Sequence, residues 1–309
     1  MIWLWSASAK SLVRFHAHTQ RMHVSTLTLN DGNKVPWIAF GTGTALYRQD
    51  VRHPVSLAIQ SGFNHLDGAQ EYENEEFLDA AIVASGKPRS ELYITTKLGT
   101  LQAGATPKSA LEESLRKLQL NHIDLYLIHH PKSHVGRLKE VWKGMEETKN
   151  AGLTKSIGVS NFTPDNLREI LEDATIPPAV NQLEVHPYLL NALQLNLALH
   201  KQYNIVTSSY GALSPLVRGE GGPLDPVVEN IRARLERTRG TPVSGGQVLL
   251  KFLQQKNILV VTTSSKAQRM DEYLDTENIP DLIPEEIQEI EAAGAKLHRR
   301  FFPRCWPPE

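Results

Sequence analysis

From His23 onward, short apolar or β-branched runs alternate with amphipathic segments along the chain. The strand-like runs lie at 37–40, 63–67, 92–97, 123–130, 154–160, 179–185, 204–210 and 258–263. The segments between them repeat apolar residues at spacings of three and four, as in Leu111, Leu115 and Leu118, which predicts helices. Strands that are apolar on both faces and alternate with helices predict a parallel sheet.

Eight such units in about 280 residues favour a closed (β/α)8 TIM barrel over an open doubly wound sheet. The open fold would carry a GxGxxG loop after its first strand, and the turn Gly41-Thr42-Gly43-Thr44 is too short for that pattern. Two helix starts are marked by Thr106-Pro107 and Thr163-Pro164, each an N-cap followed by proline. Residues 25–36 are expected to form a β-hairpin that plugs the N-terminal mouth of the barrel.

The first twenty-two residues have a different composition from the rest of the chain. They carry three basic residues, several serines and no acid, and the first acidic residue of the chain is Asp31. A basic, acid-poor leader is typical of a mitochondrial transit peptide. An unstructured extension, or an upstream start codon with Met22 as the usual first residue, would look the same. We expect residues 1–22 to be a disordered or targeting extension and 23–309 to form one barrel domain, with a short C-terminal loop.

Composition narrows the class of protein further. No stretch approaches the roughly 20 uncharged apolar residues that a transmembrane helix needs. Lys+Arg 33 against Asp+Glu 34 gives a net charge of -1, which does not favour nucleic acid or anionic lipid as a partner. Cys305 is the only cysteine, and neither CxxC nor HExxH occurs, so no metal site is expected. A cytoplasmic location is expected, with the mitochondrion as the alternative that the leader leaves open.

Four proton-carrying side chains follow the ends of three neighbouring predicted strands. Asp67 ends the second strand, Tyr72 follows it in the loop, Lys97 ends the third strand and His129 the fourth. Each alone has a structural explanation, such as a helix cap, rim packing, a solvated strand end or a core histidine. Active sites of (β/α)8 barrels lie at the C-terminal ends of the strands, so the four together predict an active site.

These side chains suit the reduction of a carbonyl group. A buried ammonium next to a phenol lowers the pKa of the phenol, so Lys97 is expected to lower that of Tyr72 while Asp67 holds the lysine in place. His129 is placed to hydrogen-bond the carbonyl oxygen. The set contains neither a nucleophile nor a metal, so a hydride must come from a cofactor.

Five segments resemble the aldo-keto reductase superfamily, in its order and spacing, from about residue 26 to residue 300. They are HLDGAQEYENEE at 65–76, ITTKL at 94–98, DLYLIHHP at 124–131, SIGVSNF at 156–162 and NQLEVHP at 181–187. The resemblance implies an NADPH-dependent barrel reductase acting on a small carbonyl substrate. It also implies a monomer or a weak dimer.

The same resemblance assigns residues to roles. Its catalytic tetrad falls on Asp67, Tyr72, Lys97 and His129. It implies nicotinamide contacts at Ser160, Asn161, Gln182 and Tyr210, of which Tyr210 would stack on the ring. The turn residues Gly41, Thr42 and Gly43 are further candidate cofactor contacts.

The chain departs from the family pattern where the 2′-phosphate of the cofactor is bound. Many members have a lysine-serine pair there, and this chain has TTSSKAQR at 262–269, with Ser264 at the lysine position. Ser264, Ser265, Lys266 and Arg269 can still bind the phosphate, and Arg269 can do so with two hydrogen bonds. NADPH is therefore expected to be preferred, with weaker use of NADH.

Three positions are expected to shape the substrate pocket. Gly99 and His130 stand where many members have bulky apolar side chains, which predicts a wider and more polar pocket. Trp306, in a short tail, is either a lid over this pocket or a packed tail side chain. The HLDGAQ and VTTSSK variants resemble a fungal branch that reduces α-ketoamides, conjugated polyketones and ketopantoyl lactone. An activated dicarbonyl is thus the favoured substrate, because His130 can bond its second oxygen.

Other functions remain open on the sequence alone. Related fungal enzymes reduce sugar or glycerol aldehydes, and others reduce ketones in secondary metabolism. Related barrels also serve as NADPH-binding regulatory subunits of potassium channels, or as lens structural proteins, and these can keep the same four residues. The tetrad therefore does not by itself separate an enzyme from a binding protein.

Overall fold

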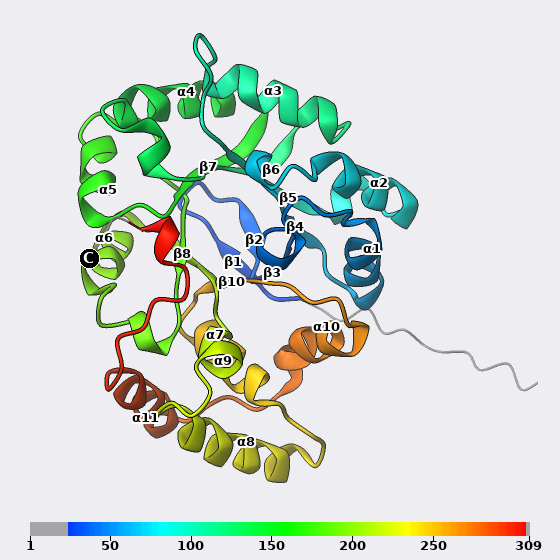
Figure 1. Ribbon diagram of the computed structural model, residues 1–309, viewed down its shortest axis with the longest axis vertical. Helices are drawn as coiled ribbons and strands as arrows, with labels where there is room; N and C mark the ends of the chain where they lie inside the picture. Colours follow the sequence, from blue (N-terminus) through cyan, green and yellow to red (C-terminus); the bar gives the residue numbers. More distant parts are fainter. Residues whose placement is uncertain (1–23, 307–309) are drawn as a thin grey trace, which may run out of the picture.

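A computed structural model describes residues 24–306, and it confirms the predicted (β/α)8 barrel (Figure 1). Eight parallel strands close in the order β10-β3-β4-β5-β6-β7-β8-β9. Their bounds are β3 Ile38–Gly41, β4 His65–Asp67, β5 Tyr93–Leu98, β6 Ile123–Ile128, β7 Thr154–Ser160, β8 Val180–Glu184, β9 Val206–Tyr210 and β10 Leu259–Thr262. All residues of β5 and β6 are buried, as expected for strands covered on both faces. The expectations for residues 1–22 lie outside the described part of the chain.

Helices surround the barrel in Figure 1. They are α1 Arg52–Ser61, α2 Glu75–Ser85, α3 Pro107–Lys117, α4 Leu138–Asn150, α5 Pro164–Leu171, α6 Gln194–Tyr203, α7 Ser214–Arg218, α8 Asp225–Arg239, α9 Gly245–Gln255, α10 Ala267–Leu274 and α11 Pro284–Gly294. Both predicted helix starts are confirmed, because the hydroxyls of Thr106 and Thr163 accept the N–H three residues later. Within residues 24–306, none of these helices is long and apolar enough to cross a membrane.

The expected hairpin closes one end of the barrel. Strands β1 (Thr26–Thr28) and β2 (Lys34–Pro36) pair antiparallel around a turn in which Gly32 has a φ of 84°. Leu29 and Val35 belong to the same buried cluster as Tyr93, Val180 and Leu259. Those three residues begin β5, β8 and β10, so the hairpin covers the N-terminal end of the barrel. The C-terminal ends of the strands are thereby left as the accessible end.

Candidate active site

A cavity of about 420 Å³ lies at the C-terminal ends of the strands, which is the size range of ligand sites. The predicted site residues that line it are Gly41, Gly43, Asp67, Tyr72, His129, His130, Ser160, Asn161, Gln182, Tyr210 and Arg269. The predicted site residues outside its wall are Thr42, Lys97, Gly99, Ser264, Ser265, Lys266 and Trp306. Closing the barrel therefore gathers most of the expected residues around one space.

A buried charged pair lies beneath Tyr72. Lys97 Nζ donates to Asp67 Oδ1 and, at 2.9 Å, to the Gly68 carbonyl oxygen, and the side chains of Lys97 and Asp67 are 0% and 2% exposed. The same ammonium lies 3.3 Å from the Tyr72 hydroxyl. Gln182 Nε2 donates to the other oxygen of Asp67 at 2.9 Å. The carboxylate is thus satisfied on both sides and holds the ammonium against the phenol.

The expected lowering of the Tyr72 pKa is not what the structure gives. Burial raises the pKa of the phenol above its ordinary value, and Lys97 opposes this without overcoming it. For Lys97, burial lowers the pKa, but Asp67 and Tyr72 raise it more, so the net shift is upward. The pKa rises because desolvation disfavours the phenolate more than one shared ammonium favours it. At neutral pH the pair is a protonated phenol next to an ammonium.

The end of β7 and the start of the following loop form another part of the cavity wall. Ser160 Oγ donates to the Gln182 carbonyl oxygen at 2.9 Å. Asn161 has a φ of 63°, a left-handed conformation that asparagine tolerates better than most residues. Its Oδ1 accepts from the Tyr210 hydroxyl at 2.6 Å, and its Nδ2 donates to the His129 carbonyl oxygen at 2.9 Å. Residues at or just after the C-terminal ends of β6, β7, β8 and β9 are therefore bound into one network.

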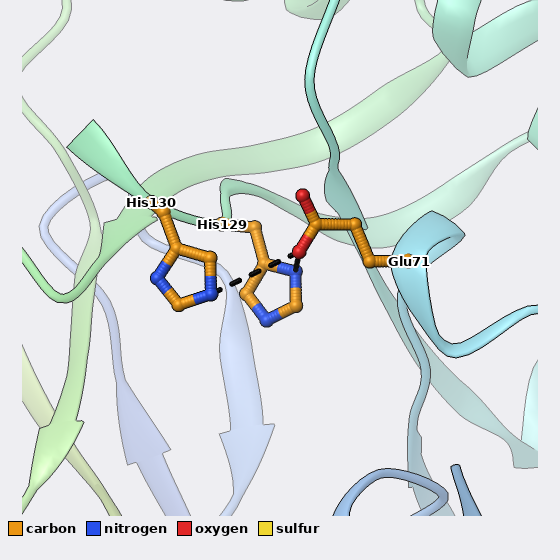
Figure 2. Close-up of side chains that lie close together, drawn as sticks. All are labelled: Glu71, His129 and His130. Carbon is orange, nitrogen blue, oxygen red and sulfur yellow. Dashed lines mark ion pairs between the residues drawn. The ribbon is translucent and has the colours of Figure 1, made fainter. Parts of the chain in front are cut away.

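Glu71 forms a cluster with His129 and His130, as Figure 2 shows. His129 follows β6 directly, and Glu71 lies in the loop after β4. Glu71 Oε2 is 3.1 Å from His129 Nδ1, although not aligned for a hydrogen bond, and 3.8 Å from His130 Nε2. Glu71 is not among the site residues predicted from the sequence, and its one local signal is its place immediately before Tyr72 in a polar loop.

The proton of His130 can be placed from its neighbours. Asn161 Nδ2 lies 3.1 Å from His130 Nδ1, and the amide nitrogen can only donate. Nδ1 is then an acceptor, so the neutral ring carries its proton on Nε2, which faces Glu71. Burial lowers the pKa of His130 to about 3, so the ring is neutral at physiological pH.

The same geometry argues against a shared metal ion. Within residues 24–306, Glu71, His129 and His130 are the one group whose ligand atoms lie close enough together, within 4.8 Å. The two rings are stacked, however, with centroids 4.3 Å apart and an interplanar angle of 17°. Ligating lone pairs lie in the ring planes, and two nearly parallel planes do not converge on one ion. Asn161 moreover occupies one nitrogen of His130.

Gly99 does not widen the cavity in the way expected. A Cβ at this position would lie 3.0 Å from Glu71 Cγ, which is tighter than nearly all real contacts. The glycine therefore makes room for Glu71, and the space that a large side chain would fill is occupied by a carboxylate. The expected polarity is present, and it comes from Glu71 together with His130.

Two arginines lie on the other side of the cavity. Arg269 of α10 and Arg218 at the end of α7 both line it. Ser264 Oγ accepts the N–H of Lys266 at 3.0 Å, which shapes the turn before α10. Ser265 and Lys266 are exposed in that turn, beside the cavity rather than in its wall.

The C-terminal tail lines the cavity with residues other than Trp306. Phe302 and Cys305 line the cavity, and Phe302 meets the Tyr210 ring edge-on with centroids 5.4 Å apart. Trp306 instead packs against Arg300, whose guanidinium carbon lies 4.2 Å from the ring centroid. Trp306 is therefore not among the described residues that line the cavity, and its role as a lid stays a prediction.

Comparison with known proteins agrees with this architecture. The family model described as aldo/keto reductase family matches residues 37–295. An NAD/NADP-dependent indole-3-acetaldehyde reductase of Schizosaccharomyces pombe is 36% identical over 281 residues, covering 88% of this chain and 96% of that protein. An aldo-keto reductase of Mycobacterium avium is 39% identical over 270 residues, covering 87% and 89%.

A solved structure extends the likeness to three dimensions. The crystal structure of a Bombyx mori aldo-keto reductase in complex with NADP superposes with a TM-score of 0.77 at 31% identity. The match covers 92% of this chain and 98% of that one. This chain therefore belongs to the aldo/keto reductase family and is an oxidoreductase that acts on carbonyl compounds.

Proposed function

We propose that the chain is an NADPH-dependent reductase of activated ketones, with Tyr72 as the proton donor. The observation that carries the proposal is the buried Lys97 ammonium, which lies 3.3 Å from the hydroxyl of Tyr72, a residue that lines the cavity. A protonated phenol beside a fixed ammonium can give up its proton as negative charge develops on a substrate oxygen. That charge development is what carbonyl reduction requires.

The residues around the cavity fit a nicotinamide dinucleotide. Gly41 and Gly43 both line the cavity. A Cβ at either position would lie within 2.7 Å of a neighbouring side chain, so this part of the wall has no room for a larger residue. The amide and hydroxyl groups of Asn161, Ser160 and Gln182 suit a carboxamide. When bound, the cofactor supplies a hydride to the substrate carbon.

The chain's own residues supply the rest of the reaction. Tyr72 passes its hydroxyl proton to the carbonyl oxygen, and Lys97 stabilises the phenolate that is left. Asp67 keeps Lys97 charged, because removing the carboxylate would leave a buried ammonium unpaired. His129 Nε2 lies on the side of the ring away from Glu71 (Figure 2), and a proton on this nitrogen lets it hydrogen-bond the same oxygen.

Replacement of Tyr72 by phenylalanine tests the role of the hydroxyl. Positioned general acids contribute roughly a hundredfold or more, so Tyr72→Phe should lose at least that factor in kcat, followed by the loss of NADPH absorbance. Tyr203→Phe, on α6 and outside the cavity wall, is the matched control. A Tyr72→Phe variant with about a tenth of the normal kcat or more would contradict the assignment. Wild-type protein that binds NADPH but reduces no carbonyl would favour the regulatory-subunit alternative.

Cofactor preference is proposed to depend on Arg269. It is the one predicted phosphate contact that lines the cavity, and charge-assisted hydrogen bonds to phosphate are strong. Arg269→Ala should weaken NADPH use by roughly ten- to a hundredfold and leave NADH use nearly unchanged. Arg168→Ala, an exposed arginine on α5 paired with Asp165, is the control. An unchanged ratio of kcat/KM for the two cofactors would refute the role.

The proposed substrates are vicinal dicarbonyls such as ketopantoyl lactone and α-ketoamides. The stacked rings of His129 and His130, with centroids 4.3 Å apart, support this assignment, because one imidazole is available for each oxygen of a dicarbonyl. The test compares kcat/KM for dicarbonyls with kcat/KM for aldehydes. The dicarbonyls are ketopantoyl lactone and isatin, and the aldehydes are xylose and indole-3-acetaldehyde. His130→Trp should depress dicarbonyl reduction more than aldehyde reduction. Dominance of xylose, or equal losses in the variant, would overturn the substrate assignment.

A further inference from the structure

Glu184 is a buried carboxylate near the cavity that the proposed reaction does not use. It ends β8, and its side chain is 0% exposed. Gln182, two residues earlier on the same strand, donates to the Asp67 carboxylate at 2.9 Å. Side chains two residues apart on a strand point to the same side, so Glu184 lies on that side of β8, one step nearer the accessible end of the barrel. A buried carboxylate needs polar partners there, because burial without them is costly.

The C-terminal tail supplies most of these partners. One oxygen of Glu184 accepts the Phe301 N–H at 2.6 Å, and the other accepts the Phe302 N–H at 3.2 Å. Arg300 Nη1 lies 3.6 Å from the second oxygen, and His186 Nε2 lies 3.1 Å from the first. Figure 1 shows the tail, in red, running from α11 past β8. A single buried side chain therefore fixes three consecutive tail residues to the end of a barrel strand.

The fixed segment places Phe302 in the cavity wall. The Phe302 ring meets the Tyr210 ring edge-on, with centroids 5.4 Å apart. Gly211 makes room for this ring, since an added Cβ there would lie 2.8 Å from Phe302 Cε2. The guanidinium carbon of Arg218 lies 4.9 Å from the centroid of the same ring. The position of this aromatic part of the wall thus depends on how the backbone of Phe302 is held.

We propose that Glu184 is a positioning residue that sets how tightly the enzyme binds an aromatic ketone substrate, by holding Phe302 in the cavity wall. Among the described residues, its hydrogen bonds and ion pairs are with the tail and His186, and none is with a reacting group. Tyr210 is held separately, because its hydroxyl donates to Asn161 at 2.6 Å. Loosening the tail therefore changes substrate binding and leaves the proposed nicotinamide contacts in place. This inference rests on the proposed reductase function and adds a residue that determines its specificity.

Replacement of Glu184 by glutamine isolates this role. Glutamine keeps the size of the side chain, but its NH₂ group cannot accept a hydrogen bond, so one of the two tail N–H groups loses its partner. Glu146→Gln is the matched control. Glu146, on α4 and outside the cavity wall, is 7% exposed and accepts the N–H groups of Thr175 and Ile176, both at 2.7 Å. The control therefore breaks the same kind of buried contact without touching the cavity wall.

The experiment compares two dicarbonyl substrates, isatin and diacetyl, with NADPH as the cofactor. Isatin has an aromatic ring that can pack against Phe302, and diacetyl has none. Loss of an aromatic contact weakens binding by up to roughly tenfold, so Glu184→Gln should raise KM for isatin by about that factor. A residue that contributes binding alone changes KM and not kcat, so kcat for both substrates and KM for diacetyl should stay within about twofold. Glu146→Gln should leave both KM values within about twofold.

A double-mutant cycle tests whether Glu184 acts through Phe302. Phe302→Ala removes the aromatic ring directly and should also raise KM for isatin roughly tenfold. Adding Glu184→Gln to Phe302→Ala should then raise it no further, because the two changes remove one contact. A general loss of stability would instead add to the effect of Phe302→Ala. Phe302→Ala changes a half-buried tail side chain, so it keeps the inference testable if Glu184→Gln does not fold.

The outcomes separate this inference from the proposed function. An unchanged KM for isatin in Glu184→Gln or Phe302→Ala, an equal rise for diacetyl, an equal rise in Glu146→Gln, or additive effects in the cycle overturns the role of Glu184 and leaves the reductase function standing. No reduction of either dicarbonyl by the wild type overturns the proposed function. Calorimetric binding of isatin to the protein with NADP⁺ then decides the role of Glu184. Binding roughly tenfold weaker in Glu184→Gln supports this role, and unchanged binding overturns it.

Discussion

Gly43 limits the position of Tyr72, and this makes one substitution especially informative. Gly43 precedes the short 3₁₀ helix Thr44–Leu46 with φ −86° and ψ −163°, a conformation that alanine adopts without strain. An added Cβ, however, would lie 2.6 Å from Cζ of Tyr72 and 3.0 Å from both Cε atoms. Gly43→Ala therefore acts on the Tyr72 ring and not on its own backbone.

The required displacement can be estimated from these distances. Carbon atoms pack at about 3.5 Å, so the ring must move by about 0.9 Å. It has little room, because it meets the His129 ring edge-on at 5.3 Å and lies 4.9 Å from Lys97 Nζ. A misplacement of about 1 Å at a reacting group costs on the order of a hundredfold in rate. Overpacking of this kind lowers the free energy of unfolding by about 1–3 kcal/mol.

The assay measures kcat for ketopantoyl lactone together with urea unfolding of the same preparations. Gly43→Ala should lose roughly a hundredfold in kcat while staying folded at the assay temperature. Gly246→Ala is the control, since its Cβ would meet no atom closer than 3.6 Å, and its kcat should not change. A Gly43→Ala enzyme within twofold of the wild-type kcat would refute the reasoning that the Tyr72 position is tightly limited.

Three further predictions concern stability. Burial lowers the pKa values of His65 and His200 to about 4, so the unfolded chain takes up their protons first as the pH falls below about 6.5. The free energy of unfolding should fall by about 2 kcal/mol per histidine between pH 7 and 5, and equal urea midpoints would contradict this. Glu184 accepts the N–H groups of Phe301 at 2.6 Å and Phe302 at 3.2 Å, so Glu184→Gln should loosen the tail. Faster hydrogen exchange at these two amides measures the loosening, and unchanged protection would count against it. Thr163→Ala removes the N-cap of α5 and should cost about 1 kcal/mol in urea unfolding; no change would indicate that the cap is dispensable.

The strand count, the barrel and several of the site residues follow from local patterns. Each apolar run becomes a strand because its residues suit burial on both faces, and each Thr-Pro pair starts a helix through its own backbone neighbours. Parallel strands in a closed barrel must end at the same face. The positions of Asp67, Lys97 and His129 at the ends of their strands are therefore enough to predict that the three lie together.

Contacts between distant loops could not be predicted in this way. Glu71 meets His129 and His130 only because the loop after β4 and the end of β6 face the same cavity, and Gly99 permits the contact by lacking a side chain. Nothing in the local sequence of any of these residues specifies such a contact. The tail behaves similarly, since Phe302 and not Trp306 reaches the cavity.

The sequence by itself thus determined the fold, the end of the barrel that carries the chemistry and the residue types of the proton-transfer group. Only the tertiary structure decided the pKa shifts and charge states of the site residues. The direction of the Tyr72 pKa shift depends on the balance between burial and the Lys97 charge, and the neutral state of His130 depends on its burial. Desolvation is a property of the whole closed barrel, so no spacing of residues along the chain can report it.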